Sequence, residues 1–473
     1  MSFTSFAFIL FLPIVFFAYW ILQSHLRLQN LLLVVASYVF YSWWNVRFLL
    51  LIIITSLSSY ASALLINRIP QKGKLILGLT ILVNFGILAC FKYYNFFAEN
   101  FHDLMERVGL QVSLPVLSVI LPVGISFYTF QSMGYILDVY RGKVKPATDL
   151  IAFLAFISFF PQLVAGPIER ATSLLPQMLN KRSFDRNGAV DGMRQVLWGF
   201  FKKMVIADTC AMCVNQVWIS WHDATGTMLL IGAILFSFQI YCDFSGYSDI
   251  AIGVSKLFGI RLCDNFLYPY FSRNMSEFWR RWHMSLMTWF RDYVYIPLGG
   301  SLCSAKRTAL NILIVFLLSG LWHGANWTFV TWGVYHAFFL ILLLVFGKRH
   351  RRYENPASLR QLPSVIFTFV VVSIGWVIFR ADTVDNGIAY IVRMVSLLPT
   401  INLGDFIMGK VALILSVCLL VIEWFTRQRR FPLDFSLTGL FRYPVCRWLL
   451  YYFLLLCICF MHGEKQEFVY FQF

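Results

Sequence analysis

Residues 317–336 read LLSGLWHGANWTFVTWGVYH and place a histidine inside an apolar run of membrane-spanning length. An ionisable side chain at that depth costs about 2.5 kcal/mol or more in its charged form. His323 is therefore either a neutral, hydrogen-bonded residue that links two helices, or a functional residue. This stretch alone leaves both interpretations open. Gly320 and Gly324 slightly favour function, because without side chains they let backbone or a substrate approach the ring closely, and Asn326 offers an amide to orient a ring nitrogen.

The composition of the whole chain indicates an integral membrane protein. Of the 473 residues, 59% are hydrophobic and 13% are charged, whereas about 25% are charged in a soluble domain. The 48 Phe, 22 Tyr and 15 Trp residues suit lipid-facing helices with interfacial aromatic belts. The net charge of +16 comes from Lys and Arg that cluster in short loops between apolar runs, as the positive-inside bias requires. We therefore expect membrane lipid, and no nucleic acid, as a partner.

The cysteines and the first residues give no sign of a metal site or a removable leader. The single C-x-x-C motif, Cys210 to Cys213, has no second pair or histidine cluster to complete a zinc site. We expect no metal and no tightly bound cofactor. The N-terminal apolar run has no basic segment before it and no small-residue cleavage site after it, so it is expected to be a first transmembrane helix.

Long apolar runs predict an all-α polytopic membrane protein, organised as one domain over residues 1–473. The expected spans are 5–22, 30–44, 48–66, 75–91, 114–139, 150–168, 193–219, 227–259, 309–322, 326–346, 363–379, 410–426 and 446–461. The basic loops 67–74, 141–149, 348–361 and 427–444 are expected to be cytoplasmic. All four fit one side only if 150–168, which Pro161 and Pro167 break, is re-entrant. We then expect about 11 to 12 crossings.

The stretch SEFWRRWHMSLMTWFRDY, residues 276–293, has the periodicity of an amphipathic helix with Ser276 as its cap. Trp279 and His283 fall on its apolar side. One interpretation is an interfacial helix whose arginines snorkel to the cytoplasmic surface. The other is a site for the phosphates of a cytoplasmic donor. The arginines concerned are Arg280, Arg281 and Arg291.

A polar stripe lies within the expected span 227–259. Gln239, Asp243 and Tyr247 recur at intervals of four residues and share one helix face, and Asp249 follows two residues after Tyr247. Interhelical hydrogen bonds of about 0.6 to 2 kcal/mol each explain such side chains without catalysis. We therefore expect Gln239, Asp243 and Asp249 to be supporting polar residues.

The chain ends in HGEKQEFVYFQF, residues 462–473. The order of the spans places this tail on the external side of the membrane. Its composition is that of an aromatic interfacial anchor.

Several motifs together resemble the membrane-bound O-acyltransferase (MBOAT) family, in its bacterial branch of alginate O-acetylation proteins, peptidoglycan O-acetyltransferases and the D-alanyl teichoic-acid transfer protein. They occur in the family's order over nearly the whole chain: FQIYCDFSGYSDIAIG, NFLYPYFSRNMSEFWRRWHMSL, RDYVYIPLGG and LSGLWHGANWTFVTWG. The resemblance implies a ring of transmembrane helices around a central tunnel, with re-entrant and interfacial helices. It maps the catalytic histidine onto His323 and the second histidine motif onto His283.

The same resemblance implies an activity and partners. An acyl group, here acetyl from acetyl-CoA, passes across the bacterial inner membrane to an extracytoplasmic partner with an SGNH-type fold, which esterifies a polysaccharide such as peptidoglycan or an alginate-like polymer. The ending FVYFQF resembles the branch's acyl-accepting F-x-Y-F-x-F tail and indicates Tyr470 as the acceptor. Beside the three arginines, the candidate donor-contacting residues are Trp279, Trp322 and Asn326.

Ionisable residues within the membrane are also typical of a second class of protein, the transporters. In a proton-coupled transporter or flippase, Asp243, Asp249 and His323 would form a proton relay. The sequence shows no repeated halves and no matching pair of interrupted helices, which many transporters have. The acyltransferase is therefore the favoured hypothesis.

Overall fold

A computed structural model describes residues 1–112, 114–117, 121–347, 355–397, 403–434, 439–461, 463 and 466–469. These residues form helices and connecting segments, with no strand among them, which confirms the expected all-α class. The chain divides into two compact units, Met1–Ala189 with Ser255–Cys263, and Val190–Val254 with Asp264–Phe473. The expectation of one domain stays a prediction.

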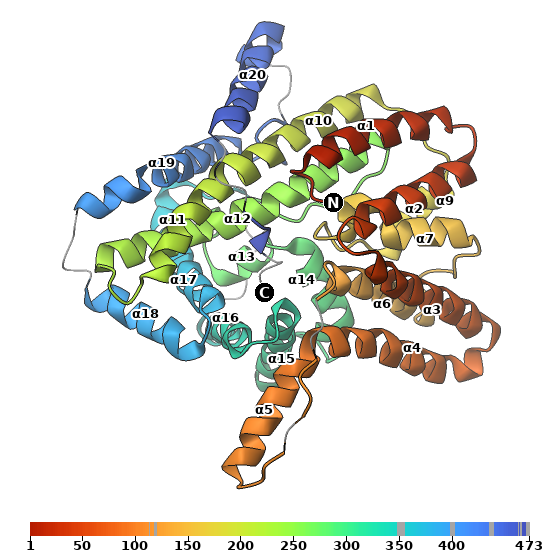
Figure 1. The fold of residues 1–473 in the computed structure, drawn as a ribbon, viewed down its shortest axis with the longest axis horizontal. Coiled ribbons are helices and arrows are strands. Elements are labelled where there is room, and N and C mark those ends of the chain that lie inside the picture. Colours follow the sequence, from red (N-terminus) through yellow and green to blue (C-terminus); the bar gives the residue numbers. More distant parts are fainter. Residues whose placement is uncertain are drawn as a thin grey trace. The chain divides into compact units, whose positions relative to one another are not determined.

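The first unit contains nine α-helices. In this unit α3 packs against α4 and α6, and α2 packs against α7 (Figure 1). The helices are α1 (Phe6–Ile21), α2 (Leu26–Ser42), α3 (Leu49–Arg68), α4 (Gly73–Leu88), α5 (Tyr94–Arg107), α6 (Ile125–Tyr140), α7 (Leu150–Ser158), α8 (Phe160–Leu163) and α9 (Ala171–Leu179).

Two expected spans of this unit differ in length from the helices found. The span expected at 114–139 begins as a helix only at Ile125, because Pro122 cannot continue a helix and Gly124 adopts φ 76°. The 150–168 segment is broken as expected, since α7 ends at Ser158 and α8 begins with Pro161 in its first turn. Its crossing or re-entrant topology stays a prediction.

Side chains provide hydrogen-bond partners for a backbone carbonyl near this break in the helix. The carbonyl of Phe156 accepts hydrogen bonds from the amides of Gln131 (2.7 Å) and Gln162 (2.9 Å), and all three residues are buried. A broken helix is stable in a membrane protein where the protein itself supplies such partners. Gln131 and Gln162 are therefore structural.

The second unit carries the helices of the candidate site. They are α10 (Arg186–Phe200), the π-helical η4 (Phe201–Ala207), α11 (Asp208–Ile219), α12 (Gly226–Leu257), α13 (Met275–Trp279), α14 (Met284–Phe290), α15 (Ala305–His323), α16 (Trp327–Phe346), α17 (Leu362–Arg380), α18 (Val384–Ser396), α19 (Leu403–Thr426) and α20 (Pro444–Phe460). α15 and α16 lie side by side as a hairpin, and α17 packs against α16 (Figure 1).

Glycines close the α15–α16 hairpin, and of the two uses expected for them the structure shows the close approach of protein atoms. A Cβ on Gly320 would clash with the backbone oxygen of Phe329, and a Cβ on Gly324 would clash with the Phe329 ring. The space beside these glycines is therefore filled by α16 and is not open to a substrate. Their role is close helix packing.

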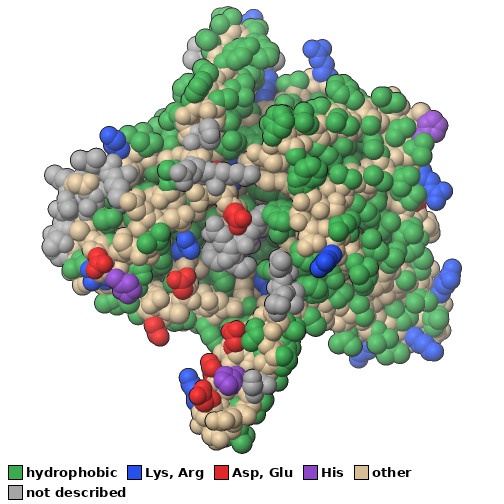
Figure 2. Space-filling view, viewed as in Figure 1, with side chains coloured by type: hydrophobic (Ala, Val, Ile, Leu, Met, Phe, Trp, Pro, Cys, Tyr) green, Lys and Arg blue, Asp and Glu red, His purple; other side chains and the backbone are tan. Residues whose placement is uncertain are grey.

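Seven described helices are long and apolar enough to cross a membrane, and three further apolar helices are shorter. Hydrophobic side chains cover much of the visible surface of the first unit (Figure 2). On α1, for example, Phe6, Ile14 and Phe17 are 73%, 69% and 65% exposed. Such a surface needs lipid as its solvent, and the protein is a multi-pass membrane protein.

Candidate active site

His323 is the last residue of α15 and is only 4% exposed. Three aromatic rings surround its imidazole with near-perpendicular planes, at centroid distances of 4.9 Å for Trp322, 5.0 Å for Trp332 and 5.4 Å for Phe379. Asn326 lies at the start of α16, where its side chain accepts from the Thr328 N–H and donates to the Asp382 carbonyl. These bonds give Asn326 a role in capping α16.

His283 interrupts the helix that the sequence predicted at 276–293. α13 ends at Trp279, His283 adopts the left-handed conformation with φ 44°, and α14 begins at Met284. The N-terminal cap is Asn274, not the expected Ser276, because the Asn274 side chain accepts from the Glu277 N–H. A single amphipathic helix was therefore a wrong prediction, although His283 does face the interior and is 1% exposed.

Asn265 explains why the backbone turns at His283. Its main-chain carbonyl accepts from the Met284 N–H at 2.9 Å. Its side-chain Oδ1 lies 3.0 Å from Nδ1 of His283 and also accepts from the N–H and hydroxyl of Ser285. Its Nδ2 donates to Ser248 on α12. Sequence analysis missed Asn265, although it opens the NFLYPY motif.

The Asn265 contacts fix the form of the His283 ring. Because the Ser285 backbone N–H can only donate, the amide atom facing it must be the oxygen, and Nδ1 of His283 must then carry a proton. Burial lowers the pKa of His283 from 6.5 to about 3, so the ring is neutral near pH 7. A neutral ring protonated on Nδ1 carries its lone pair on Nε2.

Trp322 joins the two histidines. Its indole lies 5.6 Å from the His283 ring and 4.9 Å from the His323 ring, measured between centroids. Two sequence motifs that are far apart in the chain therefore meet around one tryptophan. Of the candidate donor-contacting residues, Trp322 is the one that contacts both imidazoles, whereas Trp279 packs against Phe316 and Trp332.

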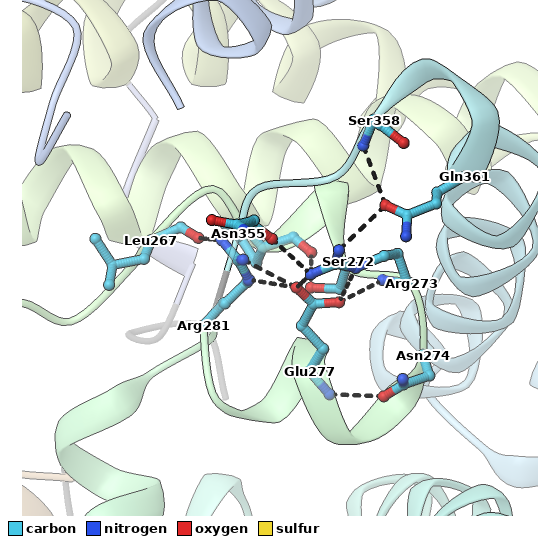
Figure 3. Close-up of polar contacts among 10 residues, drawn as sticks. Leu267, Ser272, Arg273, Asn274, Glu277, Arg281, Asn355, Ser358 and Gln361 are labelled. Atoms are coloured by element: carbon cyan, nitrogen blue, oxygen red, sulfur yellow. Dashed lines mark hydrogen bonds and ion pairs between the residues drawn. The ribbon is translucent and has the colours of Figure 1, made fainter. Parts of the chain in front are cut away.

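The three candidate arginines have different surroundings. Arg281 and Arg273 both bind Glu277, with Nη2–Oε1 distances of 2.9 and 2.7 Å, and Arg281 also donates to the Leu267 carbonyl (Figure 3). Arg281 is thus held inside this network. Arg280 is exposed, and the Arg291 side chain is 59% exposed beside Asp292.

The polar stripe of α12 faces two lysines that sequence analysis missed. Lys202 lies 2.6 Å from Asp249, and Lys203 lies 2.8 Å from Asp243 and 2.7 Å from Asp208. The lysines are consecutive residues of η4, a π-helical turn of a kind that often occurs at functional sites. The signal was available, because buried intramembrane charges require partners. Gln239, the third member of the stripe, is 4% exposed.

A small polar cavity of about 20 Å³ has Asn265 in its wall. Its wall contains the Lys202–Asp249 pair and the Tyr241 hydroxyl, which donates to Glu423 at 2.7 Å. Arg430 also lines it. Buried charged and polar groups therefore line the same cavity as Asn265, the residue that orients His283.

The tail enters the second unit. Phe468 and Val469 are 6% and 2% exposed, and Phe468 contacts the rings of Phe244 and Tyr247 on α12. Tyr470 lies outside the described residues. The two residues directly before it are buried in the protein interior.

Buried imidazoles within a bundle of apolar helices indicate a membrane-embedded enzyme. The sequence profile of the membrane-bound O-acyltransferase family matches residues 75–380, and the chain belongs to that family. It is a membrane-bound O-acyltransferase, and this membership replaces the transporter hypothesis.

The relatives are bacterial proteins. The chain is 42% identical over 391 residues to the probable alginate O-acetylase AlgI of Pseudomonas aeruginosa, which covers 81% of this chain and 73% of the relative. It is 33% identical over 421 residues to the peptidoglycan O-acetyltransferase of Helicobacter pylori, covering 82% and 78%. It is 31% identical over 274 residues to the teichoic acid D-alanyltransferase of Bacillus subtilis, covering 54% and 68%.

Proposed function

We propose that this protein moves an acetyl group from cytoplasmic acetyl-CoA across a bacterial inner membrane to an extracytoplasmic SGNH-type partner. The partner then O-acetylates a cell-wall polymer or exopolysaccharide, such as peptidoglycan or an alginate-like chain. The names of two relatives support acetyl transfer to such polymers. The observation that carries the proposal is the convergence of His283 and His323 on Trp322, within one unit that also buries the tail before Tyr470.

In the first step Tyr470 is the nucleophile and His323 the base. The phenol oxygen bonds to the thioester carbonyl carbon as His323 takes its proton, the carbon–sulfur bond breaks, and the proton passes to the departing CoA thiolate. Ordinary pKa values of about 10 for a phenol and about 6.5 for an imidazole make full proton transfer uphill by about 5 kcal/mol. Concerted attack in a water-poor site offsets a difference of that size.

In the second step the tyrosyl ester gives its acetyl group to the partner. A phenol is a better leaving group than an alkyl alcohol, so the ester stays reactive toward a serine of the SGNH-type protein. The chain thereby regains a free Tyr470 hydroxyl. The net reaction moves acetyl from sulfur to oxygen and releases CoA.

His283 and the candidate donor-binding residues prepare the first step. The Nε2 lone pair of neutral His283 accepts a hydrogen bond that positions the phenol or the donor, and Trp322 packs against the acyl group between the two imidazoles. Arg280 and Arg291 contact the donor's phosphates. Arg281 supports them by holding Glu277, while Trp279 and Asn326 shape the site through the packing and capping contacts described above.

Labelled acetyl-CoA tests the proposal. Purified protein is incubated with acetyl-CoA carrying a radioactive acetyl group, with no partner present, and the denatured polypeptide is counted. We expect covalent label in the C-terminal peptide and release of free CoA. A protein that leaves the thioester intact would refute the proposed acetyl donor.

A further inference from the structure

The tail lies in a defined slot of the second unit. The Val469 N–H donates to Oδ2 of Asp243 at 2.7 Å. The Gln466 carbonyl accepts from Lys203 at 3.3 Å, and the Gln466 side chain accepts from Asn215 at 3.3 Å. Three contacts from three helical elements thus hold a segment of four residues by its backbone and by one side chain.

The floor of the slot is aromatic. Phe468 lies 5.9 Å from Phe244 and 5.2 Å from Tyr247, measured between ring centroids. Both partners lie on α12, where Phe244 directly follows Asp243 and Tyr247 lies about one helical turn after it. Burial of the Phe468 ring supplies affinity, while the bond to Asp243 sets the register of the tail.

The charges of the slot suit a peptide backbone. Lys203 lies between two carboxylates, those of Asp208 and Asp243, and all three side chains are at most 10% exposed. The Val469 N–H points at the Asp243 carboxylate, and a charge-assisted hydrogen bond of this kind is about twice as strong as a neutral one.

The slot also leads toward the histidines. Phe244, which contacts Phe468, has its ring 4.7 Å from the His283 ring in a perpendicular arrangement. Trp322 then connects His283 to His323. Tyr470 follows Val469 directly, so the slot fixes the residue from which the proposed nucleophile extends.

We propose that Lys203, Asp208 and Asp243, together with the Phe244–Tyr247 floor, form a docking slot for the chain's own tail. They are positioning residues that hold Tyr470 for its reaction. The catalytic consequence rests on the proposed function, whereas docking of the tail does not.

Hydrogen–deuterium exchange of the intact protein in detergent measures docking without reference to activity. We expect the C-terminal peptide of the wild type to exchange slowly. Phe468→Ala should speed that exchange roughly tenfold or more, because loss of a buried aromatic ring shifts a binding equilibrium by at least that factor. Phe460→Ala is the matched control, since Phe460 is 81% exposed on the neighbouring α20, and it should leave the exchange unchanged.

Asp243→Asn tests the charge. It keeps the side chain's size and leaves Lys203 paired with Asp208, so the variant should fold. Tail exchange should rise, and the maximal rate of tail acetylation should fall at least roughly tenfold with the apparent KM for acetyl-CoA unchanged, because ground-state donor binding does not use the slot. A structural defect would instead alter exchange in α12 and α15 as well.

The outcomes separate the two proposals. Fast exchange of the wild-type tail, or wild-type exchange in both Phe468→Ala and Asp243→Asn, would overturn the slot. A protected tail combined with normal polymer acetylation by Tyr470→Phe would refute the acetyl relay, and would leave the slot standing.

Discussion

Asn265 and His283 are joined through Oδ1 and Nδ1 at 3.0 Å, and the same oxygen binds Ser285, so the amide is locked as an acceptor. This bond holds the proton of His283 on Nδ1. The bond therefore links a residue 18 positions before His283 in the chain to the chemistry of the site.

Removal of this acceptor should impair turnover. In Asn265→Ala the ring is free to rotate and to change tautomer, and we expect maximal acetyl transfer to fall by about 10- to 100-fold, part of the usual contribution of an acid–base group. The measurement is the initial rate of label transfer from acetyl-CoA. An unchanged rate in a folded variant would show that orientation of His283 is unimportant.

Asn265→Asp should change the pH dependence. In the wild type the His283 pKa lies near 3, depressed by burial, so the ring stays neutral from pH 5 to 9. A carboxylate at position 265 favours the protonated ring and raises that pKa. The variant should lose activity relative to wild type as the pH falls from 8 to 5. Parallel pH–activity profiles of the two proteins would contradict the role given to a neutral His283.

His323→Ala should abolish acetyl transfer, with a loss of at least about 100-fold, because it removes the base proposed to take the phenol proton. The packing around the ring is aromatic, so the protein should remain folded with a lowered melting temperature. Label on the C-terminal peptide is the measurement. Trp332→Phe, which keeps an aromatic ring beside position 323, is the comparison for lost packing alone.

Tyr470→Phe isolates the hydroxyl. The ring and its anchoring area remain, but the oxygen that would carry the acetyl group is gone. We expect normal acetyl-CoA binding and no acetylation of the partner or the polymer, with no adduct on the C-terminal peptide by mass spectrometry. Normal polymer acetylation would return the tail to the role of an aromatic anchor.

The exposed arginines should affect donor binding more than turnover. Arg280→Gln and Arg291→Gln should each raise the apparent KM for acetyl-CoA by roughly two- to fivefold, the size of a solvent-exposed charge contact. Arg107→Gln on α5 is the control for loss of a surface charge. Equal KM values in all variants would leave Arg280 and Arg291 as determinants of topology.

The sequence predicted the helical class, the membrane and the two histidines, because these depend on composition and on local motifs. It did not predict the break at His283, because residues 276–293 have good helical periodicity. The turn there is imposed by Asn265, which lies outside that stretch. The sequence left open whether backbone or a substrate lies beside Gly320, since only the packed hairpin shows that Phe329 fills the space. Lys202 and Lys203 were missed for the same reason, as their partners lie on another helix.

The covalent link between α20 and the buried Phe468 makes the tail a tethered ligand. A ligand joined to its site by a short tether has an effective concentration in the millimolar range, set by the length of the tether and not by the number of molecules in the cell. The slot is then filled at every level of expression, and its occupancy does not depend on how many copies of the protein the membrane holds.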